Sequence, residues 1–376
     1  MAESGEDARE VASDPPLETT ESLPGPPELQ VPRTPAAIAG RALQTLLSLG
    51  LAAALLGWGL PYLTQTPWSA ILDIVTGIGW GTFAGLLALM GLGLFCYTFT
   101  MTGALPGLTH AQALVANLAG SGVSNVLPGG GAFGTVLTYS MFRSWRFGHR
   151  SIGTFIVVTS VWNMLARVLL PVLAALVLLP SSQQVPTAMI RGAAVGGAGG
   201  ALVAATLIAV ITSRRAARGV GRAVDRIVVA CRRALRGGRP PGAAPDVEAM
   251  ALDLREQTIA IVRHRWVRLT GGIVGFMGTY FVLFAACLHA VGVQLSWGHA
   301  FAAYAVGRLL TAVAVTPGGI GVAEAGSAAV LLALGVPGDV TAAAVTLFAL
   351  FSFVLEIPFG AVAIVIWLQT RSRHRS

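Results

Sequence analysis

Residues 315–324 read Val-Thr-Pro-Gly-Gly-Ile-Gly-Val-Ala-Glu, and residues 125–134 read Asn-Val-Leu-Pro-Gly-Gly-Gly-Ala-Phe-Gly. Each cluster interrupts an otherwise apolar stretch: residues 315–324 lie within 297–336, and residues 125–134 lie within 108–145. Proline removes a backbone donor and glycine weakens a helix, so backbone groups at each cluster lose their helical partners. At membrane depth such backbone is tolerated only where protein or water covers it. The sequence therefore predicts two broken helical hairpins.

The residues around these clusters have the composition of a membrane protein. Of 376 residues, 54% are hydrophobic and only 11% are charged, and the mean hydropathy is +0.71. Apolar runs long enough to cross a bilayer as helices occur six times. The predicted fold is all-α and polytopic, with two broken or re-entrant hairpins and six spanning helices at residues 42–60, 80–101, 151–179, 190–213, 266–289 and 339–368.

The arginines predict the orientation of these spans. Basic residues concentrate in loops on the cytoplasmic side of a membrane protein. If the N-terminus is cytoplasmic, the arginines of segments 143–150, 214–268 and 371–375 all lie inside, and the external loops hold only Arg191. We therefore expect a multi-pass protein of the bacterial plasma membrane with both termini in the cytoplasm. The chain contains no lysine, which excludes the phosphate-binding loop of ATP-driven transporters.

The sequence divides into a tail, a membrane domain and a short basic end. Residues 1–38 are acidic and proline-rich, which predicts disorder, residues 39–370 form the membrane domain, and residues 371–376 are a basic cytoplasmic tail. The cytoplasmic loop 214–265 is basic and contains an amphipathic pattern over residues 220–236. Such a helix either lies on an anionic leaflet or is solvated and only sets the topology. Without a nucleic-acid-binding module, we expect no nucleic-acid partner.

An internal repeat relates the two hairpins. Adding 189 to the residue number superposes His110 on His299 and Pro128-Gly-Gly on Pro317-Gly-Gly. The predicted repeats cover residues 42–179 and 190–368. Three spans separate the two breaks, and because three is odd, the units face opposite sides of the membrane. Inverted repeats with broken helices are typical of secondary transporters.

The broken hairpins are also the candidate binding site. Half-helices that begin after Gly131 and Gly321 would direct unpaired N–H groups inward, which suits a phosphate or a carboxylate. The alternative is that both loops serve packing alone. The candidate substrate-binding residues are Asn117, Ser121, Asn125, Pro128, Gly129, Gly130, Gly131, Arg308, Pro317, Gly318, Gly319, Gly321 and Glu324.

Four charged residues lie deep within the predicted spans and hairpins, away from their ends: Arg167, Arg308, Glu324 and Glu356. Charges at this depth are costly and usually face a partner or a cavity. Arg308 and Glu324 lie at similar distances from Pro317 on the two hairpin arms, so we expect them to pair. Arg167 and Glu356 form a second candidate pair. A structural role and a substrate-facing role both remain open for these charges.

Asn117–Gly134 and Thr316–Glu324 resemble the lysylphosphatidylglycerol synthase transmembrane-region family, also called flippase-like domain proteins. The resemblance covers residues 40–370 and implies a domain that moves lipids between leaflets. The best-known members carry a soluble aminoacyltransferase domain. Only a short tail follows Leu368, so we expect no lipid synthesis. The first break departs from the family pattern, because Thr135 follows Gly134 where an acidic residue is common.

These observations favour an ATP-independent flippase for a phospholipid or polyprenyl-linked lipid with a phosphate-bearing headgroup. The alternative is a non-transporting membrane partner of a cell-envelope glycosyltransferase or lipid-modifying enzyme. We expect no enzymatic activity, since Ala119 replaces the first glycine of a rhomboid-type motif around Ser121 and no HExxH sequence is present. We expect no cofactor and no metal, and the expected partners are lipids with anionic headgroups.

Overall fold

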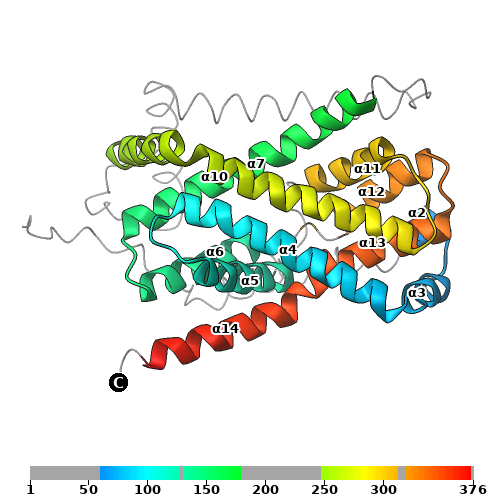
Figure 1. The fold of residues 1–376 in the computed structure, drawn as a ribbon, viewed down its shortest axis with the longest axis horizontal. Helices are drawn as coiled ribbons and strands as arrows, with labels where there is room; N and C mark the ends of the chain where they lie inside the picture. Colours follow the sequence, from blue (N-terminus) through cyan, green and yellow to red (C-terminus); the bar gives the residue numbers. More distant parts are fainter. Residues whose placement is uncertain (1–59, 128–129, 179–246, 312–318, 320, 374–376) are drawn as a thin grey trace, which may run out of the picture.

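The computed structural model describes residues 60–127, 130–178, 247–311, 319 and 321–373 (Figure 1). Within these ranges every regular element is a helix, which confirms the all-α prediction. Four helical segments are long and apolar enough to cross a membrane. They are α4 (Trp80–Ala104), α7 (His149–Leu178), residues Arg255–Ala290 of α10 (Val247–Ala290), and the segment Gly338–Thr370.

The last of these segments consists of three helical pieces. It begins with α13 (Gly338–Ala349), continues through the π-helix η3 (Leu350–Val354) and ends with α14 (Glu356–Arg373). These four segments match four of the six predicted spans. Of the other two, 190–213 and all of 42–60 except Leu60 lie outside the described residues, as do residues 1–38 and the amphipathic pattern of the basic loop.

The two broken hairpins are pairs of helices too short to cross the bilayer. Hairpin 1 consists of α5 (His110–Val126) and α6 (Gly130–Ser144), and hairpin 2 of α11 (Trp297–Leu310) and α12 (Val322–Ala333). With 12 to 17 residues each, these helices are roughly 18–26 Å long, less than the ~30 Å of the hydrocarbon core. Two further short helices, α2 (Leu60–Thr64) and α3 (Trp68–Thr76), precede α4.

Local capping explains where the outer arms of the hairpins begin. The Thr109 hydroxyl accepts the Gln112 N–H at 3.2 Å, and the Gln112 side chain accepts the Thr109 N–H at 3.1 Å. This reciprocal capping box satisfies two free donors at the start of α5. The Ser296 hydroxyl accepts the His299 N–H in the same way at the start of α11.

The hairpins open toward opposite ends of the molecule (Figure 1). Hairpin 1 lies beside the C-terminal end of α4, and hairpin 2 beside the start of α13. The shift of 189 residues also relates the helix boundaries. It carries Ser144, the end of α6, onto Ala333, the end of α12, and His149, the start of α7, onto Gly338, the start of α13. This is the arrangement expected of an inverted repeat.

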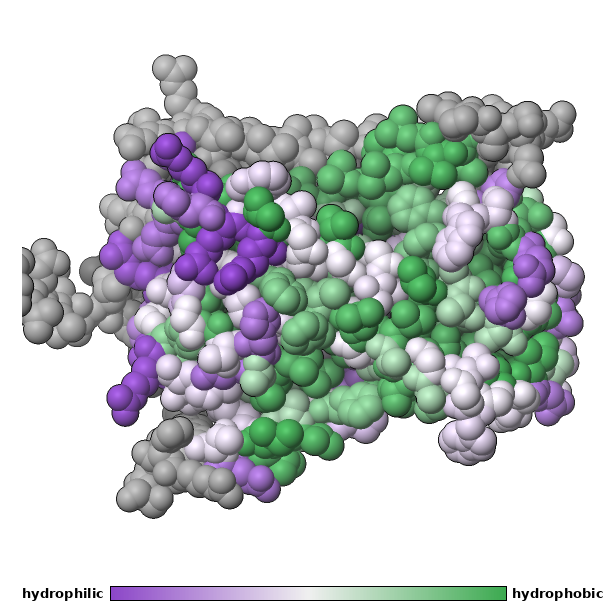
Figure 2. All heavy atoms as spheres, in the orientation of Figure 1, coloured by the Kyte–Doolittle hydropathy of each residue, from purple (hydrophilic) through white to green (hydrophobic). Residues whose placement is uncertain are grey.

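The turn between α6 and α7, with the helix ends beside it, and the first half of α10 carry exposed arginines, namely Arg143, Arg146, Arg150, Arg263 and Arg268, and we call this the arginine-rich end of the molecule. Figure 2 shows hydrophilic residues concentrated at one end, beside a hydrophobic central band. Long-range hydrogen bonds join the helix ends that meet at the arginine-rich end. Arg265 donates to the Thr102 carbonyl at 3.4 Å, and the Trp367 indole donates to the Ser144 hydroxyl at 2.9 Å. Thus the end of α4 and the first half of α10 lie together, as do the ends of α6 and α14.

Small residues allow close packing between the helices. A Cβ at Gly272 of α10 would lie 2.4 Å from the Thr100 nitrogen of α4. A Cβ at Gly360 of α14 would lie 2.9 Å from the Gly122 Cα of α5. Small residues that let backbones approach are a common basis of helix association in membranes. The second contact holds hairpin 1 against the last spanning segment and thereby positions one wall of the site.

Candidate functional site

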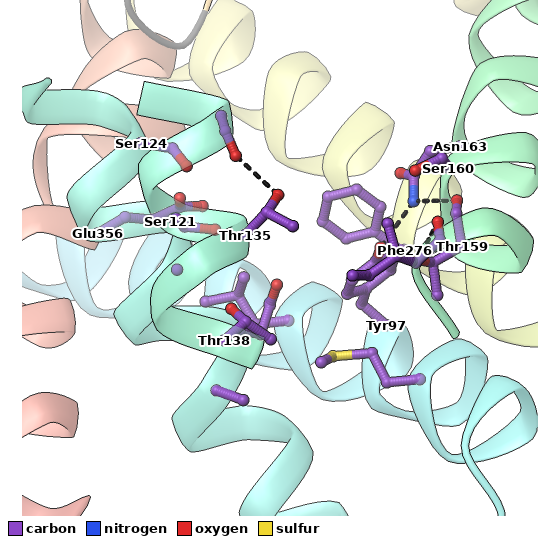
Figure 3. A pocket seen from close by; sticks show the side chains of 18 of the residues that line it. Tyr97, Ser121, Ser124, Thr135, Thr138, Thr159, Ser160, Asn163, Phe276 and Glu356 are labelled. Carbon is purple, nitrogen blue, oxygen red and sulfur yellow. Dashed lines mark hydrogen bonds between the residues drawn. The ribbon is translucent and has the colours of Figure 1, made fainter. Parts of the chain in front are cut away.

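A cavity of about 580 Å³ lies between the two hairpins and α4, α7, α10 and the start of α14. Figure 3 shows its wall formed by hairpin 1 on one side and by α7 and α10 on the other. Eight of the residues singled out from the sequence line it. They are Asn117, Ser121, Asn125 and Gly131 of hairpin 1, Arg308 and Gly319 of hairpin 2, and Arg167 and Glu356. The structure thus brings residues of both hairpins and three of the four predicted intramembrane charges to one cavity.

The other predicted site residues have different positions. Gly321 and Glu324 do not line this cavity. Gly130 is placed as the first residue of α6. Pro128, Gly129, Pro317 and Gly318 lie outside the described residues.

Arg308 is the most enclosed cation of the cavity, with 9% of its surface exposed. Its guanidinium carbon lies 4.9 Å from the ring centre of Tyr280, and Tyr304, Phe348 and Phe276 also surround it at 5.5 to 5.9 Å. Aromatic faces at this distance attract a cation. Its Nε donates to the Tyr304 hydroxyl at 3.3 Å, and that hydroxyl donates to the Met277 carbonyl at 2.9 Å. The side chain is therefore held in one orientation.

The predicted ion pair between Arg308 and Glu324 is wrong. Glu324 Oε2 accepts the Gly321 N–H at 2.6 Å, and no ion pair joins Glu324 to Arg308 in the described structure. Gly321 has a φ of 88°, which directs its N–H toward the third residue of α12. A carboxylate is also stabilised at a helix N-terminus by the helix dipole. The similar depth of Arg308 and Glu324 on the two arms of hairpin 2 predicted that they pair, but Glu324 instead caps its own helix, α12.

The predicted pair of Arg167 and Glu356 is also wrong. Glu356 Oε1 accepts the Tyr280 hydroxyl at 3.2 Å, and Glu356 Oε2 accepts the Asn125 amide at 3.3 Å. The same Asn125 amide donates to the Phe353 carbonyl, within the π-helix, at 3.2 Å. Neutral donors therefore satisfy this carboxylate, and Asn125 links hairpin 1 to the last spanning segment.

Two guanidinium nitrogens in the cavity wall lack partners. Arg308 Nη2 and Arg167 Nε are buried and make no hydrogen bond within the described structure. A buried charged donor without an acceptor is costly, because it has lost its water and gained nothing in return. An anion in the cavity would supply the missing acceptors. The described residues contain no group of three or more His, Cys, Asp or Glu side chains suited to a metal ion.

The polar wall of the cavity includes residues that the sequence reasoning missed. Thr135 and Thr138 of α6 face Thr159, Ser160 and Asn163 of α7 across the space (Figure 3). The Asn163 amide donates to the Tyr97 hydroxyl at 2.6 Å and to the Thr159 carbonyl at 2.9 Å. The polar residues recur every three or four positions along α6 and α7, and this spacing could have predicted that they share one face of each helix. Hydroxyl oxygens on both sides suit a hydrated or polyhydroxylated group.

Together the fold and the cavity define a polytopic membrane protein with a polar, cationic site between two opposed half-membrane hairpins. The chain belongs to the family of the lysylphosphatidylglycerol synthase TM region, whose sequence model matches residues 42–360. This finding confirms the resemblance noted from the Pro-Gly motifs. No curated protein matches the chain significantly. Family membership is compatible with a role that involves membrane lipids.

Proposed function

We propose that this protein is an ATP-independent flippase that moves a lipid with a phosphate-bearing headgroup between the leaflets of the bacterial plasma membrane. The observation that carries the proposal is the pair of unpartnered guanidinium donors, Arg308 Nη2 and Arg167 Nε, in one cavity lined by both hairpins. Guanidinium groups bind phosphate through charge-assisted hydrogen bonds. A site of this kind lowers the cost of bringing an anionic headgroup into the bilayer.

In this mechanism the headgroup occupies the cavity while the chains stay in the lipid. The hydroxyls of Thr135, Thr138, Thr159 and Ser160 replace part of the headgroup's water, and the arginines bind its charge. Because the hairpins come from opposite ends, movement of each hairpin can open the cavity toward one leaflet. Alternating exposure of a midplane site is how inverted-repeat transporters work. Net movement then follows the lipid gradient and needs no nucleotide.

Reconstituted liposomes test the proposal directly. Purified protein should accelerate the exchange of fluorescent phosphatidylglycerol between leaflets without ATP, measured by dithionite quenching of the outer-leaflet probe. Fluorescent phosphatidylcholine should move more slowly, because its ammonium group weakens the attraction to the arginines. If no lipid of an anionic and zwitterionic panel, including a polyprenyl phosphate, moves faster than in protein-free liposomes, the flippase proposal fails. The non-transporting membrane partner would then be the better account.

The orientation is a second proposal with its own test. The arginine-rich end holds the turn between α6 and α7, and the opposite end holds the turn between α10 and α11. With the arginine-rich end in the cytoplasm, a Gln294→Cys variant of a cysteine-free protein should react with an impermeant maleimide in intact cells. A Gly148→Cys variant should react only after the membrane is opened. The reverse pattern would invert the proposed topology.

A further inference from the structure

A second cavity, of about 920 Å³, lies at the arginine-rich end between hairpin 1 and α14. We call it the vestibule. Basic side chains line one part of it and aromatic and aliphatic side chains another. Those used below are Tyr139, Arg143, Arg146, His149, Ile366 and Trp367.

The basic part of the vestibule presents available guanidinium donors. Arg143 uses one nitrogen, Nη1, to donate to the Phe147 carbonyl at 2.7 Å, and its side chain is exposed. Arg146 is exposed and has no partner for its guanidinium in the described part of the chain. It also lies two residues after the end of α6 with a φ of 67°, the left-handed conformation in which the chain usually places glycine after a helix. A strained residue whose long cationic side chain faces a groove is a reason to look for a ligand there.

The remainder of the vestibule suits an acyl chain at the membrane interface. Ile366 is 45% exposed, and the buried Trp367 donates its indole N–H to Ser144 at 2.9 Å. Tryptophan and arginine together are typical of the headgroup level of a bilayer, where an apolar surface meets a charged one. Phosphate at the guanidinium groups and a chain along Ile366 match the two parts of one phospholipid molecule.

The vestibule and the central cavity share Tyr139, which lines both. The Tyr139 hydroxyl is hydrogen-bonded to His149 Nδ1, and the two rings are stacked. The pair links α6 to the start of α7, and Tyr139, which lines both spaces, is the partition between them.

We infer that the vestibule is a second lipid-binding site, which holds the phosphate of an anionic phospholipid from the adjoining leaflet beside the partition to the central cavity. Its role as the access site for transport rests on the proposed flippase function; the binding itself does not. We infer a lipid, and not a free phosphate, because the arginines and the apolar side chains line the same groove.

Site-specific photocrosslinking tests this inference. p-Benzoylphenylalanine is placed at Ile366, within the vestibule, or at the neighbouring Val365, which is exposed on α14 but does not line the groove. The protein is reconstituted in equimolar phosphatidylglycerol and phosphatidylcholine, and lipid adducts are counted by mass spectrometry. The ratio of phosphatidylglycerol to phosphatidylcholine adducts should be about tenfold higher at Ile366, since two arginines face an anionic lipid there.

The double variant Arg143→Gln/Arg146→Gln should lower the ratio at Ile366 to that at Val365. Arg263→Gln, which removes an exposed arginine of α10 outside the vestibule, should leave it unchanged. Equal ratios at the two positions, or a ratio insensitive to the double variant, would overturn the inference. Arg308→Met distinguishes the binding site from the flippase function, because it should prevent lipid transport and leave the adduct ratio at Ile366 unchanged. If the wild-type protein showed the higher adduct ratio at Ile366 but no lipid exchange, the second lipid-binding site would stand and the flippase proposal would fail.

Discussion

Replacing Arg308 by methionine is expected to lower the rate of phosphatidylglycerol exchange in liposomes by about 100-fold or more. Hydrogen bonds to a charged group contribute about 1.5–3 kcal/mol each, and every 1.4 kcal/mol changes an equilibrium tenfold. Arg308 offers the phosphate its unpartnered Nη2 and a full positive charge. Methionine fills a similar space among the four aromatic rings but has neither the hydrogen-bond donor nor the positive charge. The dithionite assay measures the loss.

The same substitution should leave the thermal stability in detergent unchanged or raised. Arg308 has no counter-ion in the described structure, so its removal breaks no ion pair and relieves a desolvated charge. Leu309→Met, at the next position of α11 and outside the cavity lining, is the matched control and should keep wild-type transport. If Arg308→Met retained transport, or lost it together with its stability, the arginine would not be the anion-binding group of a flippase.

Replacing Gly134 by leucine is expected to cause the largest loss of stability among single substitutions in hairpin 1. A Cβ at Gly134 would lie 2.2 Å from the Ser124 hydroxyl and 2.5 Å from the Gly120 carbonyl, so the two arms would have to separate. Overpacking of this kind costs about 1–3 kcal/mol and occasionally more. Thermal unfolding in detergent should shift downward by roughly 1–4 °C.

Gly131→Leu is the control for this prediction. Gly131 lies one turn earlier in α6 and lines the same cavity, but a Cβ there meets no atom within 4 Å. Its unfolding temperature should stay close to that of the wild type. Equal destabilisation by both substitutions would show that α5 and α6 are not packed as described here.

Much of the architecture follows from local sequence. Apolar length predicted α4, α7 and the segment from Gly338 onward within a few residues, and the end of α10 within one residue. The apolar part of α10, however, begins at Arg255, earlier than the predicted start at residue 266. The Pro-Gly clusters predicted the hairpins, because the chemistry that breaks a helix is local. The same locality brought Asn117, Ser121, Asn125 and Arg308 onto one candidate list, and the structure places all four on one cavity.

The partners of the charged residues could not be predicted in this way. Depth along a helix follows from the residue number, but the direction of a side chain depends on how helices pack. Glu324 turns back to cap α12, and Glu356 meets Asn125 and Tyr280 from distant parts of the chain. The hydroxyl wall was missed for a related reason, since threonines such as Thr135 are common in membrane helices and bond to their own backbone.

The π-helix at Leu350–Val354 has a consequence for how the last span is compared between sequences. Its wide turn, closed by the bond from the Leu355 N–H to the Leu350 carbonyl at 2.9 Å, accommodates one residue more than an α-helical turn. A helical wheel drawn with constant steps from Gly338 to Thr370 therefore misplaces Glu356 and every later side chain by about 100°. If a relative has an ordinary α-helix here, an alignment without a one-residue gap would match Glu356 to a lipid-facing position of that relative. A one-residue deletion in this turn would rotate the Glu356 carboxylate away from Asn125 and Tyr280.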